Sequence, residues 1–180
     1  MHKFLLQHQK VLIFSIGCVL IPCMLASTLL WMGFSERNFS GLLAESTFFP
    51  WIHIGSLFML AWLCVMLWII ARDSRDKKQI IIQLLILSVL ISSALFIRWD
   101  FDNSLLQSIH IFLSYAAFIY MNLLFYRYCH LYLYEGKIYL ALVFTAFMIS
   151  LSQGVIMGIS EVLYAGTCSV LLSLIALKKI

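Results

Sequence analysis

Charged side chains are scarce in this sequence, and their scarcity is the first constraint on its structure. Asp, Glu, Lys and Arg make up only 11% of the 180 residues, whereas 63% are hydrophobic. A water-soluble protein needs many more polar residues to cover its surface. The composition therefore excludes an ordinary soluble globular protein, and we expect most of the chain to lie in lipid.

The sequence also lacks the short motifs that identify many enzymes and cofactor proteins. Its five cysteines have neither the spacing of a disulfide framework nor that of a zinc site, and all of them except Cys129 lie in apolar segments. It contains no HExxH pair of histidines, so we predict no metal site. No motif assigns a reaction or a cofactor, and whether the protein is an enzyme stays open at this point.

Long apolar runs take the place of these motifs. An α-helix needs about 20 residues to cross roughly 30 Å of hydrocarbon, and six runs approach that length. None of them has the alternation of a transmembrane strand. The predicted spans are residues 11–33, 50–71, 79–97, 106–126, 138–157 and 162–177. We therefore predict an all-α integral membrane protein in which residues 1–180 form a single six-helix transmembrane domain.

Prolines and small residues add local expectations. Pro50 suits the first turn of the second span, where a missing N–H is harmless. Pro22 lies within the first span, where we expect it to kink the helix or to open a gap that a neighbour fills. In the last span, Ala165, Gly166 and Ser169 predict tight helix packing.

Basic residues orient the predicted bundle, because cytoplasmic loops retain Lys and Arg. Ten of the twelve fall on one side of the six-span topology, and only Arg37 and Arg98 fall on the other. The ten are Lys3, Lys10, Arg72, Arg75, Lys77, Lys78, Arg127, Lys137, Lys178 and Lys179. We predict that both termini are cytoplasmic, in a bacterial cytoplasmic membrane. This distribution explains the net charge of +4 as a topology signal and contact with anionic lipid, so no nucleic-acid partner is expected.

Aromatic residues gather on the same basic side, after the fourth span. They are Tyr126, Tyr128, Tyr132 and Tyr134, together with His130. Tyrosine at this position is typical of the aromatic belt at a membrane interface. We therefore predict an interfacial belt here and no ligand site.

Polar residues collect at one depth on the opposite, outer side. They are Glu36 in the first loop, His53, Arg98, Asp100, His110, Ser114, Gln153 and Glu161. Ionisable groups beside hydrocarbon are costly and usually face the bundle interior or a wet cavity. On the fourth span, His110, Ser114 and Ala117 share a small, polar helix face. We interpret the set as one outer-facing pocket; the alternative is that each residue separately anchors its helix at the interface.

Within this pocket the residue types indicate different roles. An imidazole beside Asp100 or Glu161 can exchange a proton near neutral pH, so His110 is the candidate general base and these three form the candidate catalytic set. Arg98 is suited to hold a phosphate. The remaining candidates for ligand contact are His53, Ser114, Gln153 and Glu36.

The order of these features resembles the six-span membrane proteins that include the damage-regulated autophagy modulators and the Golgi factors that remodel GPI-anchor lipids. The resemblance rests on Ser35-Glu36 in the first loop, Pro50, a basic inner loop, His110 followed by small residues and Phe118, and Glu161. An uncharacterised bacterial six-span family is also similar over Asp100 to His110. Val162 departs from the family pattern, which has an aromatic residue there. The resemblance implies lipid handling or membrane homeostasis, with membrane lipid as the partner.

Two further classes of function remain open. His53 and His110 lie at matched depth on two spans and could ligate one haem axially in a membrane electron carrier, with Gly55 and Ala117 leaving room for the macrocycle. A bundle with such short loops would equally suit a non-catalytic subunit or scaffold that packs against a larger membrane-protein partner.

Overall fold

The described part of the chain is helical apart from short connections and helix ends, and it contains no strand. The computed structural model describes residues 2–32, 41–42, 49–72, 77–97, 103–153 and 158–180. Within these ranges, six helices are long and apolar enough to cross a membrane. The predicted all-α architecture with six helices able to span a membrane is confirmed, as expected of an integral membrane protein.

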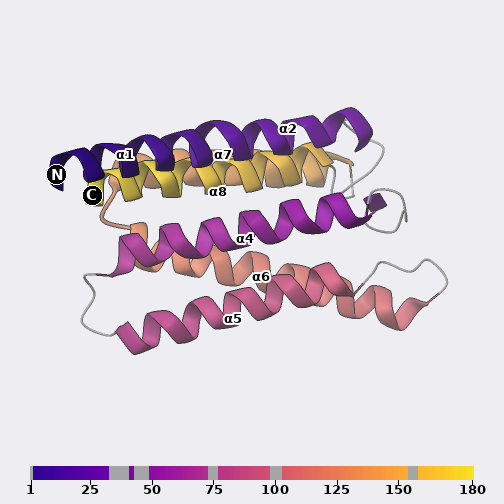
Figure 1. The fold of residues 1–180 in the computed structure, drawn as a ribbon. Coiled ribbons are helices and arrows are strands. Elements are labelled where there is room, and N and C mark those ends of the chain that lie inside the picture. Colours follow the sequence, from indigo (N-terminus) through magenta and orange to yellow (C-terminus); the bar gives the residue numbers. More distant parts are fainter. Residues whose placement is uncertain (1, 33–40, 43–48, 73–76, 98–102, 154–157) are drawn as a thin grey trace.

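The first span is built from three consecutive helical segments that continue one another, and the other five spans are single helices (Figure 1). In chain order the elements are α1 (His2–Phe14), the π-helix η1 (Ser15–Leu20), α2 (Ile21–Met32), α4 (Phe49–Ala71), α5 (Lys77–Phe96), α6 (Ser104–Cys129), α7 (Leu133–Gln153) and α8 (Gly158–Lys179). The second span runs from Pro50 to Ala71, as the sequence predicts. The fifth begins at Leu133, well before the predicted residue 138, and the sixth begins at Gly158.

An ion pair explains why α7 begins earlier than hydropathy predicts. Glu135 is buried in the first turn of α7 and pairs with Lys178 in the last turn of α8. An acid at a helix N-terminus and a base at a helix C-terminus both complement the helix dipoles. The charge that seemed to exclude Glu135 from a span is therefore matched by a residue from another helix.

The last helix, α8, lies at the centre of the bundle. It packs against α7, α4, α2, η1 and α1, and 50% of its most apolar stretch is buried, against 11% for α5. Many of its buried residues are small: Gly158, Ser160, Thr167, Cys168, Ser169, Ser173 and Ala176. Small side chains let neighbouring backbones approach closely, which is what helix association in lipid requires. The face that α5 leaves uncovered is apolar, as a lipid-facing surface should be.

A close helix approach occurs where η1 meets α8. A Cβ atom on Gly17 would stand 1.8 Å from Oγ of Ser173 and 2.8 Å from Nε1 of Trp62. These two neighbours are themselves joined, because Trp62 Nε1 donates to Ser173 Oγ at 3.1 Å. Only glycine fits at this position while the Trp62–Ser173 hydrogen bond is in place.

The π-helix and Pro22 together free one backbone carbonyl. The Ile21 N–H donates to Ile16 O, which is the longer π-helical register. In that register the Gly17 carbonyl would accept from residue 22, but proline has no N–H. The hydroxyl of Ser169 on α8 donates to Gly17 O instead, at 2.9 Å. A neighbouring helix thus supplies a partner for the Gly17 carbonyl, close to where the sequence predicts a kink or a gap at Pro22.

The small residues of the last span differ in their roles. Ser169 is fully buried against the first span, as predicted. Gly166 is not, since a Cβ atom there would meet nothing within 4 Å. The expectation of tight packing at Gly166 is therefore wrong.

Candidate functional site

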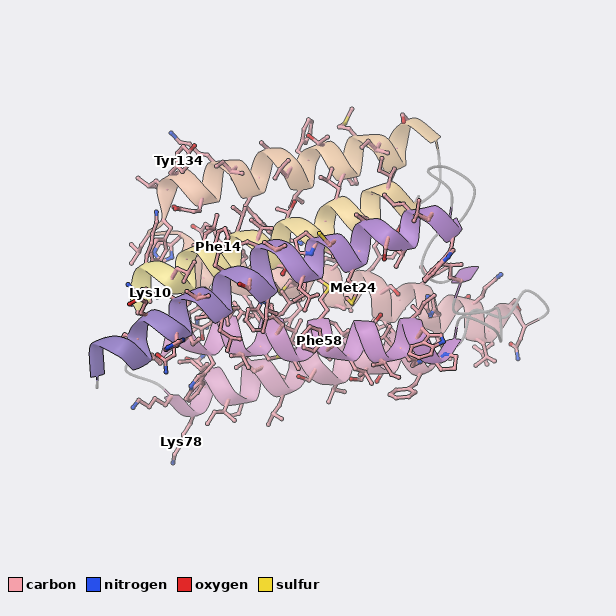
Figure 2. The ribbon with its side chains drawn as sticks, turned by 45° about the horizontal axis from the view of Figure 1, so that its top comes forward. Lys10, Phe14, Met24, Phe58, Lys78 and Tyr134 are labelled. Atoms are coloured by element: carbon pink, nitrogen blue, oxygen red, sulfur yellow. The ribbon has the colours of Figure 1, made fainter. Side chains whose placement is uncertain are left out.

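The two ends of the bundle carry different polar residues. The histidine end comprises the last turns of α2, α5 and α7 with the first turns of α4, α6 and α8; the basic end is opposite and holds both chain termini (Figure 1). Figure 2 shows Lys10, Lys78 and Tyr134 toward the basic end, with Met24 and Phe58 farther along the bundle. The outer-pocket hypothesis concerns the histidine end.

His110, in the second turn of α6, is held by the end of α5. The residue is only 5% exposed, and its Nδ1 lies 2.8 Å from the carbonyl oxygen of Ile97. A carbonyl oxygen accepts hydrogen bonds only, so Nδ1 carries the proton when the imidazole is neutral. Nε2 then carries the lone pair, and it is the nitrogen suited to accept a proton or bind a ligand.

His53, in the second turn of α4, lies against the same turn of α5. The residue is 6% exposed, and its ring centroid is 5.4 Å from that of Phe96, with the two planes inclined at 50°. Because Phe96 immediately precedes Ile97 in the chain, the two imidazoles contact adjacent residues at the end of α5: its last residue and the one after it. Helices α4, α5 and α6 thus bring both histidines to one level at this end of the bundle.

The other predicted residues divide into two groups. Glu161 lies in the first turn of α8 and is half-buried, and Ser114 is half-buried one turn beyond His110 on α6. Outside the described residues fall Arg98, Asp100 and Glu36, and with them the side chain of Gln153, the last residue of α7. The convergence of these residues on the two histidines therefore stays a prediction.

An apolar cluster adjoins the histidines. Leu42 and Ile52 are buried, and Leu29, Leu95 and Val162 pack against them. Ile52 and Leu95 directly precede His53 and Phe96 in the chain. The apolar cluster therefore lies next to the two histidines. Val162, the departure from the family pattern, is one of the residues that fill this cluster.

The space expected at Gly55 is occupied. A Cβ atom there would lie 3.4 Å from Sδ of Met24, so the open side of Gly55 faces α2. Ala117 is buried on α6. The haem hypothesis thus loses one of its two small residues. Among the described residues, no group of three His, Cys, Asp or Glu side chains is arranged to hold a metal ion.

Sequence reasoning missed a polar network in the middle of the bundle. Asn122 on α6 donates to the hydroxyl of Tyr164 on α8 at 3.1 Å and accepts from the hydroxyl of Tyr139 on α7 at 2.8 Å. An amide within an apolar span needs partners, and that was the available signal. The network links three helices and satisfies its members, which is a structural role.

Comparison with known proteins identifies no relative of this chain. Neither the protein-family models, nor the curated proteins, nor the solved structures give a match to this chain.

Proposed function

We propose that the histidine end binds a lipid headgroup and that the protein acts in lipid handling or membrane homeostasis. The observation that carries the proposal is the pair of buried imidazoles, His53 and His110, against one turn of α5. Burying polar rings beside hydrocarbon costs free energy, which is a reason to expect a ligand or a proton-transfer role. The resemblance to lipid-remodelling proteins agrees with this reading.

In this proposal the charged residues complete the site. Arg98 follows Ile97 directly in the chain and would hold the phosphate of the headgroup, while Nε2 of His110 would accept a hydrogen bond from a headgroup hydroxyl or ammonium group. If the protein is an enzyme, His110 is its general base, oriented by the Ile97 carbonyl and assisted by Asp100 or Glu161. Ser114, Gln153 and Glu36 would supply further contacts from α6, from α7 and from the first loop.

The proposal includes an orientation and a compartment. Both termini would face the cytoplasm of a bacterial cell, and the histidine end would face outward. What supports this is the accumulation of Lys and Arg at the basic end, where Lys10, Lys77, Lys78, Arg72 and Arg127 are exposed. Positive residues are retained on the cytoplasmic side during insertion.

Two substitutions at His110 test the headgroup site. Asparagine keeps an N–H close to the position of Nδ1 and removes Nε2, whereas phenylalanine removes both nitrogens. We expect His110→Asn to melt within a few degrees of the wild type and to lose the lipid that co-purifies with the wild type. His110→Phe should lose lipid and also stability, because the Ile97 carbonyl loses its partner at a cost of about 1–3 kcal/mol. Lipid mass spectrometry and thermal melting on the same preparations measure both effects.

The outcome that contradicts the proposal is equally specific. If His110→Asn retains the wild-type lipid, Nε2 does not contact a ligand and His110 only ties α6 to α5. If the wild type carries no lipid at all, the result contradicts the headgroup proposal and supports the alternative of a non-catalytic subunit or scaffold. Ser108→Ala is the matched control, since that exposed hydroxyl bonds only to Ser104 O in its own helix among the described contacts, at 2.8 Å.

Haem remains the second candidate because one observation favours it. The proton on Nδ1 of His110 is bonded to a backbone carbonyl, which is the arrangement usual for an imidazole that ligates through Nε2. A visible absorption spectrum of the purified protein decides the matter. A Soret band that disappears in both His53→Ala and His110→Asn would replace the headgroup proposal with haem binding.

A further inference from the structure

Helix α6 parts from α7 and α8 as it approaches the histidine end. Its close partners are α5 and, to a smaller extent, α4, although α8 is the central helix of the bundle. Figure 1 and Figure 2 both show the start of α6 apart from the start of α8. At the basic end α6 stays joined to α7 by a tight turn, in which the Tyr132 N–H donates to the Cys129 carbonyl at 2.9 Å. The helices are therefore held together at one end and separate toward the other.

One stripe of α6 faces α7 and α8. Its residues are three or four positions apart, so they share a helix face. They are Ile111, Ser114, Phe118, Asn122, Phe125 and Cys129. Ring contacts fix the direction of the stripe, because the Phe125 centroid lies 3.6 Å from that of Tyr139 on α7 and the Phe118 centroid lies 4.8 Å from that of Tyr164 on α8. Ile111 and Ser114 therefore lie on the side of α6 that faces these two helices.

The exposure of this stripe rises toward the histidine end. Cys129 and Phe125 are 0% and 3% exposed, whereas Phe118 and Ile111 are 37% and 40% exposed. Asn122 and Ser114 are half-buried. The side of α6 that α7 and α8 cover near the basic end is thus partly uncovered near the histidine end.

The uncovered part of the stripe lies within the membrane-spanning stretch of α6. The span runs from Ser104 to Cys129, and Ile111 lies about 10 Å along the helix from Ser104. The medium at that depth is hydrocarbon, and lipid tails are as apolar as the side chains of Ile111 and Phe118. An acyl chain of the bilayer is therefore the occupant that fits this surface.

We infer that lipid reaches the histidine end sideways from the bilayer, between α6 and α8, and that one acyl chain lies along Ile111 and Phe118. The inference rests on the proposed headgroup site and adds the route to it. Because His110 directly precedes Ile111, a headgroup bound at the imidazole leaves its chains beside the uncovered stripe. The path is closed toward the basic end, where Asn122 donates to Tyr164 and accepts from Tyr139. The chain therefore turns out into the bilayer near Phe118.

Two tryptophan substitutions test the route. Ile111→Trp places a large side chain in the path, whereas Ile119→Trp adds the same bulk on the outer side of α6, where Ile119 is 56% exposed. Lipid mass spectrometry should show that Ile111→Trp loses the co-purifying lipid, as His110→Asn does, and that Ile119→Trp keeps it. Both variants should melt close to the wild type. Lipid retained in Ile111→Trp, or lost equally from both variants, would overturn the route and leave the headgroup site in place.

A spin label measures the separation of the helices without reference to a bound lipid. Nitroxides are attached to Ile111→Cys and Ile119→Cys in a cysteine-free protein in liposomes. Their collisions with oxygen, which concentrates in hydrocarbon, and with a water-soluble nickel chelate are then compared. We expect equal oxygen accessibility at the two positions and little access of nickel to either.

The spin labels also separate this inference from the headgroup proposal. Low oxygen accessibility at position 111 alone would mean that α6 closes against α8 in the bilayer, and high nickel accessibility there would mean that water fills the path. Either result would overturn the inference. A wild type that carries no lipid would contradict the headgroup proposal, and the labels at positions 111 and 119 would still decide whether lipid chains enter between α6 and α8.

Discussion

A glycine, which has no side chain, allows the first span to approach α8 closely. Gly17 occupies the position where a Cβ atom would collide with Ser173 and press on Trp62. In lipid, helices associate mainly through close packing and hydrogen bonds, because the hydrophobic effect does not distinguish helix from lipid. A close contact of this kind therefore contributes more to the specificity of helix–helix packing than its small area suggests.

Gly17→Ala should destabilise the bundle because Ser173 must move and its hydrogen bond with Trp62 must break or lengthen. Overpacking of this kind costs about 1–3 kcal/mol, so we expect a melting temperature several degrees lower. Gly166→Ala is the control, since its Cβ would meet nothing within 4 Å. It should be neutral or slightly stabilising, because alanine favours a helix over glycine. Equal melting temperatures for the two variants would contradict the close approach at Gly17.

At the residue level, the sequence singles out particular side chains but not the backbone groups that hold them. His53 and His110 were identifiable because an imidazole inside an apolar run is unusual, whatever surrounds it. The carbonyl of Ile97 carries no signature in the sequence, since every residue has one. The Gly55 prediction failed for a related reason: which face of α4 meets α2 depends on Met24, which lies in another helix.

At the level of helices, the first span owes its irregularity to Pro22. A proline inside a helix removes one donor, and the chain responds with a π-helical segment immediately before it. The freed Gly17 carbonyl is then satisfied by Ser169 from α8. The carbonyl that lacks a partner in the first span thus forms a specific hydrogen bond with α8.

Pro22 and Ser169 should be energetically coupled. Ser169→Ala alone leaves the Gly17 carbonyl without its hydroxyl partner, at a cost of about 1 kcal/mol. In a Pro22→Ala background, residue 22 regains an N–H that can reach this carbonyl, so the same serine substitution should cost less. A double-mutant cycle on unfolding free energies measures the coupling. Strict additivity would mean that the carbonyl does not depend on Ser169.

The ends of the helices show where hydropathy stops being informative. The start of the second span at Pro50 could be predicted because proline marks a first turn locally. The start of α7 could not, because Glu135 reads as a loop residue until its pairing with Lys178 is known. Cys129, predicted to lie beyond the fourth span, is fully buried as the last residue of α6.

For the whole molecule, the orientation in the membrane is the main prediction. In a cysteine-free background, Ser104→Cys at the histidine end and Lys77→Cys at the basic end place one exposed thiol on each side. In intact cells an impermeant maleimide should label only Ser104→Cys, because the basic residues retain their end in the cytoplasm. Permeabilised cells supply the control, in which both variants should react. Labelling of Lys77→Cys alone in intact cells would show that the protein has the opposite orientation and would contradict the prediction.

The central position of α8 has a consequence for how the protein is made. Helices leave the ribosome in chain order, so the first five spans enter the membrane before the helix that most of them contact exists. Until then the hydroxyl that satisfies Gly17 is missing, and Glu135 must enter the bilayer boundary before Lys178 is translated. We therefore expect the bundle without α8 to be more susceptible to proteolysis than the bundle that contains it.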